Sequence, residues 1–284
     1  MANKNASRLG VGAVQFGMEY GIANKFASTD IKTIGECFDA AERHHIQIVD
    51  TAPSYGDSEK NLGAAYDFNN SFNIISKTPV FNSPEITVNE IEQLKLSVKN
   101  SLSHLNQTNL YGLLIHNCED VLKPGGERLI DALRELKKEG VVKKIGFSIY
   151  SGEVADKIEM LFKPDLIQAP INIFDQRLLK SNHIQRWRKQ KIEIHARSIF
   201  LQGLLFIRPE NLPMYFSSIK THQKNFYKWL TQRELSVLEG GLLFGLQIKE
   251  LDAIIVGVNS ADQLEEIARA AEKHETRHID FEEW

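Results

Sequence analysis

The sequence predicts an α/β fold in which eight parallel strands close into a (β/α)8 TIM barrel, a single domain over residues 1–284. Short apolar runs rich in β-branched residues alternate with longer segments of helical periodicity along the whole chain. The runs are apolar on both faces, as a parallel strand covered by helices must be. No G-x-G-x-x-G pattern follows the first run, which disfavours an open doubly wound sheet, and 284 residues suit one barrel.

The apolar runs and the periodic segments locate the individual elements. The expected strands are 9–16, 46–50, 72–77, 110–116, 143–149, 165–170, 192–199 and 253–258. The clearest expected helices are 31–45, 86–105, 126–140 and 260–274. The last of these opens with a capping-box pattern at Ser260 and Gln263. One irregular segment, 208–229, is long enough to be a lid or a binding loop.

Composition limits the binding partners and the cellular compartment that we expect for this protein. The formal charge of −3 provides no broad basic field, so nucleic acid is not an expected partner. No segment has the length of a transmembrane span, and the N-terminal residues lack the apolar core of a signal peptide. Cys37 and Cys118 have neither metal-ligand nor disulfide spacing. We therefore expect a cytoplasmic protein without a metal or a membrane contact, and, because no apolar surface stripe stands out, a monomer.

Four reactive side chains fall at the ends of three successive expected strands. Asp50 ends the second strand, Tyr55 lies in the turn after it, Lys77 ends the third strand and His116 ends the fourth. In a barrel of this type the chemistry lies at the carboxyl ends of the strands. We therefore expect these four side chains to converge in one mouth.

The four residue types together suit the reduction of a carbonyl group. A tyrosine hydroxyl is a weak acid with a pKa of about 10, and a nearby ammonium group stabilises its phenolate. An aspartate can hold that ammonium in place, while an imidazole N–H stabilises the oxygen on which charge develops. Each residue also has a structural interpretation: Asp50 as a cap, His116 as a core residue and Tyr55 as rim packing. Their occurrence on successive strands favours a catalytic site.

Several motifs resemble those of the aldo-keto reductase family, in the same order and at similar spacing. They are VDTAPSYGDSEKNLG (49–63), ISKT (75–78) and LLIHN (113–117), and the resemblance covers essentially the whole chain. It implies that Asp50, Tyr55, Lys77 and His116 form the catalytic tetrad, with Tyr55 as general acid. Lys77 and Asp50 would tune the acid, and His116 would position the carbonyl.

The same resemblance implies a nicotinamide cofactor site. Two segments are similar to those that bind the nicotinamide carboxamide in the family. They are IGFS, which contains Ser148, and QAPINIFDQR, which begins with Gln168. ARSIFLQGLL is similar to the family's pyrophosphate segment, with Arg197, Ser198 and Gly203 as candidates. IIVGVNSADQLEEI is similar to its adenosine-phosphate segment, where a helix N-terminus suits a phosphate. The candidates in that segment are Gly257, Asn259, Gln263 and Glu266.

The chain departs from the family pattern at five positions in this site. Ile149 and Ile267 replace asparagines, and Arg197 replaces the aromatic residue that commonly stacks on the nicotinamide. Gly257 and Gln263 stand where basic residues often clamp the 2′-phosphate of NADP. NADP(H) is the cofactor expected from the family, and NAD(H) remains open.

The substrate is expected to be small. The chain ends at Trp284, soon after the last expected helix, so the long C-terminal loop that shapes steroid and aromatic pockets in other family members is not expected. An open, polar pocket for a small or sugar-like aldehyde follows. The phrases VQFGMEYGIAN and QAPINIFDQRLL also resemble a bacterial branch associated with surface-sugar biosynthesis.

Two other functions stay open at this point. Lys77 at a strand end could serve as the nucleophile of a Schiff-base aldolase, which needs no nicotinamide. The chain could also be a non-catalytic barrel subunit that senses nicotinamide nucleotides. Borohydride trapping would identify the aldolase, and tight cofactor binding without turnover would identify the sensor.

Overall fold

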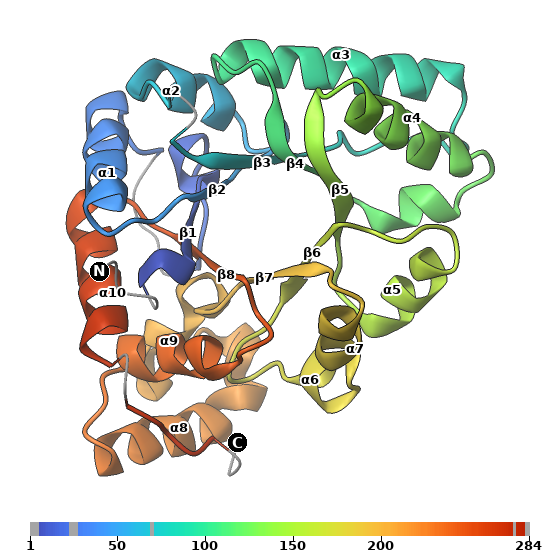
Figure 1. Ribbon diagram of the computed structural model, residues 1–284. Coiled ribbons are helices and arrows are strands. Elements are labelled where there is room, and N and C mark those ends of the chain that lie inside the picture. The colour runs from blue at the N-terminus through green and yellow to red at the C-terminus, as the bar shows by residue number, and fades with distance from the viewer. Residues whose placement is uncertain (1–5, 23–27, 69–70, 275–276, 282–284) are drawn as a thin grey trace.

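The strands of the computed structural model close into a parallel barrel in the sequential order β1 to β8, which confirms the predicted (β/α)8 architecture (Figure 1). The structure describes residues 6–22, 28–68, 71–274 and 277–281. Residues 23 and 24 of the first bacterial phrase and the C-terminal Trp284 therefore lie outside the described residues. The strands are β1 (Leu9–Gly12), β2 (Ile48–Asp50), β3 (Asn73–Lys77), β4 (Leu110–Ile115), β5 (Val142–Ser148), β6 (Leu166–Pro170), β7 (Glu193–Arg197) and β8 (Ala253–Gly257).

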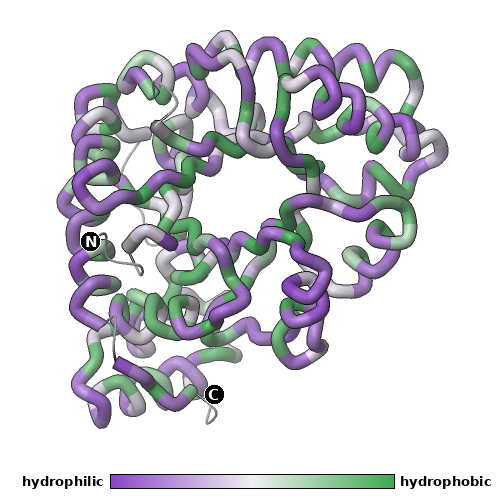
Figure 2. The backbone as a smooth tube through the Cα atoms, viewed as in Figure 1, coloured by the Kyte–Doolittle hydropathy of each residue, from purple (hydrophilic) through white to green (hydrophobic). Residues whose placement is uncertain are grey.

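Helices surround the barrel, and hydrophobic and hydrophilic residues alternate along them (Figure 2). The four clearest predicted helices correspond to α1, α3, α4 and α10, with ends within two residues of the prediction. The α-helices are α1 (Ile31–Arg43), α2 (Ser58–Ala65), α3 (Val88–His104), α4 (Glu127–Lys138), α5 (Gly152–Glu159), α6 (Arg177–Lys180), α7 (His183–Lys189), α8 (Lys220–Gln232), α9 (Val237–Gln247) and α10 (Ala261–Lys273). None of the described helices is long and apolar enough to cross a membrane.

The predicted cap of α10 forms in a modified way. Ser260 accepts a hydrogen bond from the backbone N–H of Gln263 at 3.3 Å, as a capping box requires. The side chain of Gln263 accepts from the backbone N–H of Asn259 at 2.8 Å, one residue before the cap. The helix start is therefore fixed by both side chains, with the return bond shifted by one residue.

The prediction of one long irregular segment over 208–229 was wrong in its second half, because α8 begins at Lys220. Short 3-10 turns at Pro209–Asn211 and Met214–Ile219 fill the first half. The buried residues Gln223, Phe226, Trp229 and Leu230 recur at helical spacing. Ile219 at the N-cap makes no side-chain hydrogen bond, so the sequence carries no start signal there.

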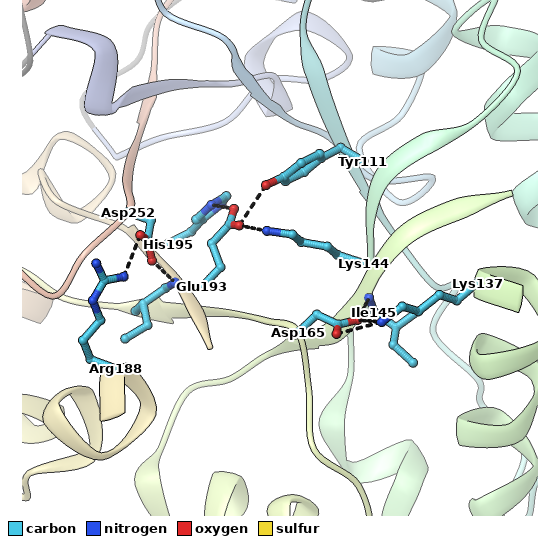
Figure 3. A network of polar contacts seen from close by, with 10 residues as sticks. Tyr111, Lys137, Lys144, Ile145, Asp165, Arg188, Glu193, His195 and Asp252 are labelled. Carbon is cyan, nitrogen blue, oxygen red and sulfur yellow. Dashed lines mark hydrogen bonds and ion pairs between the residues drawn. The ribbon is translucent and has the colours of Figure 1, made fainter. Parts of the chain in front are cut away.

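The barrel interior has polar side chains at both ends and apolar ones between them. Side chains alternate along each strand, so the inward positions repeat every second residue. Ile75, Leu114 and Leu166 form a separate buried cluster at mid-height. At the amino end, Glu193 accepts hydrogen bonds from Tyr111 and Lys144 and is bonded to His195 (Figure 3). The carboxyl end carries the residues predicted to be functional.

Candidate active site

The four predicted catalytic residues lie together at the carboxyl end of the barrel. Asp50 and Lys77 are the last residues of β2 and β3, and His116 directly follows β4. Tyr55 lies in the turn between β2 and α2. Because parallel neighbouring strands end at the same rim, the fold brings the four side chains into one mouth.

Lys77 is the anchor of this group. Its side chain is 2 % exposed, and its ammonium donates to both carboxylate oxygens of Asp50, at 2.8 and 2.9 Å, and to the carbonyl oxygen of Thr51 at 2.9 Å. Burial by itself would lower the pKa of Lys77, but the charge of Asp50, with Tyr55, raises that pKa above its usual value. Lys77 is therefore a fixed cation at neutral pH.

Tyr55 lies against this cation. The Lys77 ammonium is 4.8 Å from the centroid of the Tyr55 ring. Burial raises the pKa of the Tyr55 phenol, and Asp50 adds to this, whereas Lys77 and Arg197 act in the opposite direction. We expected the ammonium to leave this pKa below its usual value. The lysine acts with the expected sign, but the burial of the ring outweighs it.

His116 is a neutral imidazole next to Tyr55. The two rings meet edge to face with their centroids 5.9 Å apart. Burial, reinforced by the charge of Lys77, lowers the pKa of His116 to about 4. The hydroxyl of Ser54 lies 3.3 Å from His116 Nδ1, and if it donates there, Nε2 carries the proton. Ser54 was not among the predicted residues, although its place directly before Tyr55 was visible in the sequence.

Gln168 and Ser148 join this group from across the barrel. Gln168, which is fully buried, donates from Nε2 to Asp50 Oδ1 at 2.7 Å, so a residue of β6 reaches one of β2. Ser148 donates to Gln168 Oε1 at 3.4 Å, and the two residues face each other in the β5–β6 register. The two predicted carboxamide-binding side chains are therefore connected to the Lys77–Asp50 pair.

Arg197, the last residue of β7, forms the opposite wall of the mouth. Its guanidinium carbon is 4.2 Å from the centroid of the Tyr150 ring. It donates to the carbonyl oxygen of Ile149 at 3.0 Å and to the Ser198 hydroxyl at 3.2 Å. Tyr150, which is 69 % exposed, was missed by the sequence analysis because only its partner identifies it.

The segment after β7 has a backbone that few sequences adopt. Ser198, Leu201, Gln202 and Gly203 have φ values of 60°, 52°, 57° and 89°. Such left-handed conformations cost free energy in residues other than glycine, and they concentrate at functional sites. The carbonyl oxygen of Gln202 accepts from the backbone N–H of Ile22 at 2.8 Å, so this segment is tied to the loop after β1.

The remaining predicted cofactor residues run from the end of β8 into α10, and no described contact joins them to the tetrad. Gly257 ends β8, where a Cβ atom would come within 2.4 Å of the Gln15 amide nitrogen. Gln15 Oε1 is buried and has no hydrogen-bond partner within the described part of the chain, so a ligand donor could satisfy it. Glu266 is exposed, whereas Ile267 is 6 % exposed and packs in the core. Gln15 is the third residue, after Ser54 and Tyr150, that the sequence did not identify.

A closed parallel barrel with a buried Lys–Asp pair, a tyrosine and a neutral histidine at its mouth defines a class of carbonyl-acting barrel enzymes. The sequence model of the aldo/keto reductase family matches residues 8–284. The chain therefore belongs to the aldo/keto reductase family, a family of oxidoreductases, as its motifs predicted. Within the described residues no group of three or more His, Cys, Asp or Glu side chains could hold a metal ion.

Individual relatives agree with this assignment. The aldo-keto reductase YhdN of Bacillus subtilis is 30 % identical over 183 residues, which are 62 % of this chain and 53 % of YhdN. The matched region thus spans about half the length of that relative. The holo form of an aldo-keto reductase from Bacillus halodurans has a TM-score of 0.73 and 21 % identity, covering 93 % of this chain and 86 % of that one.

A protein from Pseudomonas aeruginosa, described as an aldo-keto reductase, has a TM-score of 0.67 and 21 % identity. The similarity covers 94 % of this chain and 90 % of that one. At 21 % identity, both solved structures support the barrel fold and nothing more.

Proposed function

We propose that the chain reduces an aldehyde or ketone with a nicotinamide cofactor, using Tyr55 as the general acid. The observation that carries this proposal is the buried ammonium of Lys77, held by Asp50 and placed 4.8 Å from the Tyr55 ring. A cation in that position stabilises the phenolate that remains after proton transfer.

Each member of the tetrad has one task in this proposal. A nicotinamide cofactor, when bound, would supply the hydride, with its electron pair, that the carbonyl carbon accepts. The electron pair of the C=O π bond moves to the oxygen, and the Tyr55 hydroxyl donates its proton there, which yields the alcohol and a phenolate. Neutral His116 would donate a hydrogen bond from Nε2 to the same oxygen, in the tautomer that a hydrogen bond donated by Ser54 to Nδ1 would favour.

The chain's own residues are suited to a dinucleotide. Ser148 and Gln168 are polar, buried and connected, so their amide and hydroxyl groups can bind the nicotinamide carboxamide. The segment from Ser198 to Gly203, with its left-handed residues, would follow the pyrophosphate. Gly257, Asn259, Gln263 and Glu266 would receive the adenosine half, and the unpartnered Gln15 Oε1 could accept from a ribose hydroxyl. NADP(H) is the cofactor common in the family, while Gly257 and Gln263 supply no charge for a 2′-phosphate.

The Schiff-base alternative requires a neutral lysine. Lys77 has a raised pKa and three hydrogen-bond acceptors, so its lone pair is not available. A sensor without turnover would keep the same site geometry, and turnover itself distinguishes it from a reductase.

The experiment is a fluorescence titration with NADPH and with NADH, followed by oxidation of the bound cofactor with a panel of small aldehydes. Saturable micromolar binding and turnover would support the proposal, and the ratio of the two affinities would give the cofactor preference. Binding without turnover on any carbonyl would favour the sensor. If neither nucleotide binds, the reductase proposal fails, and borohydride trapping at Lys77 becomes the next measurement.

A further inference from the structure

The guanidinium of Arg197 is a cation at the mouth that lacks an anionic partner. It is half-buried, and no carboxylate forms an ion pair with it among the residues that the structure describes. Its described hydrogen bonds engage one N–H of each terminal nitrogen, whereas a guanidinium has five N–H donors. A partly desolvated charge without a counter-ion is unfavourable, so a ligand that brings an anion would be stabilised there.

The orientation of this guanidinium is already fixed. Its face lies on the Tyr150 ring, 4.2 Å from the centroid, and two hydrogen bonds hold it to Ile149 and Ser198. A guanidinium held in this way loses little conformational freedom when it binds a planar oxyanion through two parallel hydrogen bonds.

The electrostatics of the mouth agree with an anionic ligand. Lys77 is neutralised by Asp50, and His116 is uncharged at neutral pH because its pKa is about 4. Arg197 therefore leaves these four residues with one net positive charge. The guanidinium also acts on the pKa of both Tyr55 and His116, so it lies within electrostatic range of the reacting groups.

The position of Arg197 indicates whether the anion that binds it belongs to the substrate or to the cofactor. Arg197 pairs with Pro170 in the β6–β7 register and bonds to the carbonyl oxygen of the residue after Ser148. It thus lies beside Ser148 and Gln168, where the proposed function places the uncharged carboxamide. The family resemblance counted Arg197 with the pyrophosphate segment, but the left-handed backbone that would follow the pyrophosphate begins only at Ser198. The other phosphate site of the proposed function is the start of α10. An anion at Arg197 would then come from the other reactant.

Resting on the proposed reductase function, we propose that the preferred substrate is an aldehyde or ketone with an oxyanion, a carboxylate or a phosphate, that binds the Arg197 guanidinium on its Tyr150 platform. This refines the expected open, polar pocket: the polar contact is a single oriented cation, and a neutral carbonyl compound of the same size would be a poorer substrate.

The test compares matched substrates with the complete, cofactor-bound enzyme. Succinic semialdehyde against butanal probes the carboxylate, and glyceraldehyde 3-phosphate against glyceraldehyde probes the phosphate. We expect kcat/KM to favour the anionic member of at least one pair by roughly 10- to 100-fold, the size of a charge-assisted contact. The pair that shows the preference identifies the oxyanion. The preference should decrease as salt is added. No preference in either pair would overturn the inference while the reductase function stands.

Two variants tie the preference to this residue. Arg197→Met keeps the length of the side chain and removes its charge, and should reduce the anionic-to-neutral ratio of kcat/KM by roughly 10- to 100-fold. Arg197→Lys keeps the charge without the two-pronged geometry and should retain part of the ratio. Lys143→Met, an exposed lysine near the amino end of β5, removes the same charge at the far end of the barrel and should leave the ratio unchanged.

Two results would assign Arg197 to the cofactor instead. They are an equal loss for both members of a pair, or a weakened NADPH affinity with an unchanged ratio. A protein that neither binds a nucleotide nor reduces any of the four aldehydes would contradict the proposed function itself, which is a different outcome. If Arg197→Met does not fold, Tyr150→Leu tests the same contact by removing the aromatic ring on which the Arg197 guanidinium lies. Tyr150→Phe keeps that ring and is the matched control.

Discussion

At the scale of single residues, the mouth of the barrel holds each ionisable group in one protonation state. Lys77 stays charged because Asp50 compensates for its burial. His116 stays neutral because its burial and the charge of Lys77 lower its pKa by more than Asp50 raises it. The phenol of Tyr55 stays protonated because its pKa is raised. At neutral pH the proposed acid, Tyr55, therefore carries its proton.

Removing the proton donor should stop the reaction without emptying the site. We expect Tyr55→Phe to lower kcat for carbonyl reduction by roughly 10²- to 10⁴-fold, the usual contribution of a general acid. The dissociation constant of NADPH, measured by fluorescence, should stay close to that of the wild type. Tyr215→Phe, at an 88 % exposed position, is the matched control. A Tyr55→Phe enzyme that keeps most of its kcat would exclude Tyr55 as the acid.

The pH dependence of reduction should reflect the lowered pKa of His116. Because that pKa is about 4, the imidazole is already neutral at pH 5 and does not titrate between pH 5 and 8. The kcat/KM profile should thus be flat through pH 6.5, where an ordinary histidine ionises. The rate should decline on the alkaline side only above the usual pKa of tyrosine, since the phenol must be protonated to act as the acid. An inflection near pH 6.5 that disappears in His116→Gln would contradict this account.

At the scale of elements, α8 is held by packing rather than by local signals. Phe226 is fully buried and stacks on Trp229, with ring centroids 6.2 Å apart, and meets Phe174 at 5.3 Å. The helix has no side-chain N-cap, so its stability depends on this apolar face.

Truncating the buried ring should therefore destabilise the protein. Phe226→Ala should reduce the free energy of unfolding by about 3–5 kcal/mol, the usual cost of removing a buried aromatic ring. Urea denaturation would measure the change. Lys224→Ala, on the exposed side of the same helix, should change stability by less than about 0.5 kcal/mol. Equal effects of the two substitutions would show that α8 does not contribute its buried face to the core.

At the scale of the whole molecule, the barrel carries charge at both ends but uses the two ends differently. The network at the amino end brings together Tyr111, Lys144, Glu193 and His195 from β4, β5 and β7 (Figure 3). Burial alone would raise the pKa of Glu193, but His195, with Lys144 and Tyr111, lowers it to about 2. In a TIM barrel this end serves stability rather than chemistry.

This network should make stability depend on pH in a defined window. The folded pKa of Glu193 lies below the usual value of 4.5, so the stabilisation is complete above about pH 5 and is lost as the pH falls toward about 2. Glu193→Gln should lower the free energy of unfolding at pH 7, and its difference from the wild type should shrink over this window. Urea denaturation at several pH values measures the difference. Glu92→Gln, at an exposed position, is the control and should show no such trend. A difference independent of pH would assign the effect to packing.

The sequence by itself determined the barrel and the placement of the four predicted catalytic residues at one rim, because both depend on local signals. Alternating strand and helix patterns define the eight units, and Asp50, Lys77 and His116 can be placed at strand ends without knowing how the strands pair. The turn after β2 identifies Tyr55 for the same reason. Three of the four clearest predicted helices, α1, α3 and α10, begin at a polar side-chain cap. A cap was not sufficient, since α5 and α9, capped by Ser151 and Ser236, were not among those four. The uncapped α8 was missed as well.

Only the tertiary structure decided how these residues act on one another. The bond between Gln168 and Asp50 spans the barrel, and the stack of Arg197 on Tyr150 joins two strand ends that are far apart in the sequence. The pKa of Tyr55 also depended on the fold, because burial and charge act in opposite directions and their balance requires the burial of the ring in three dimensions. Periodicity shows on which face of a strand a side chain lies. Which side chain it meets across the barrel depends on how the barrel closes and on the register of its strands.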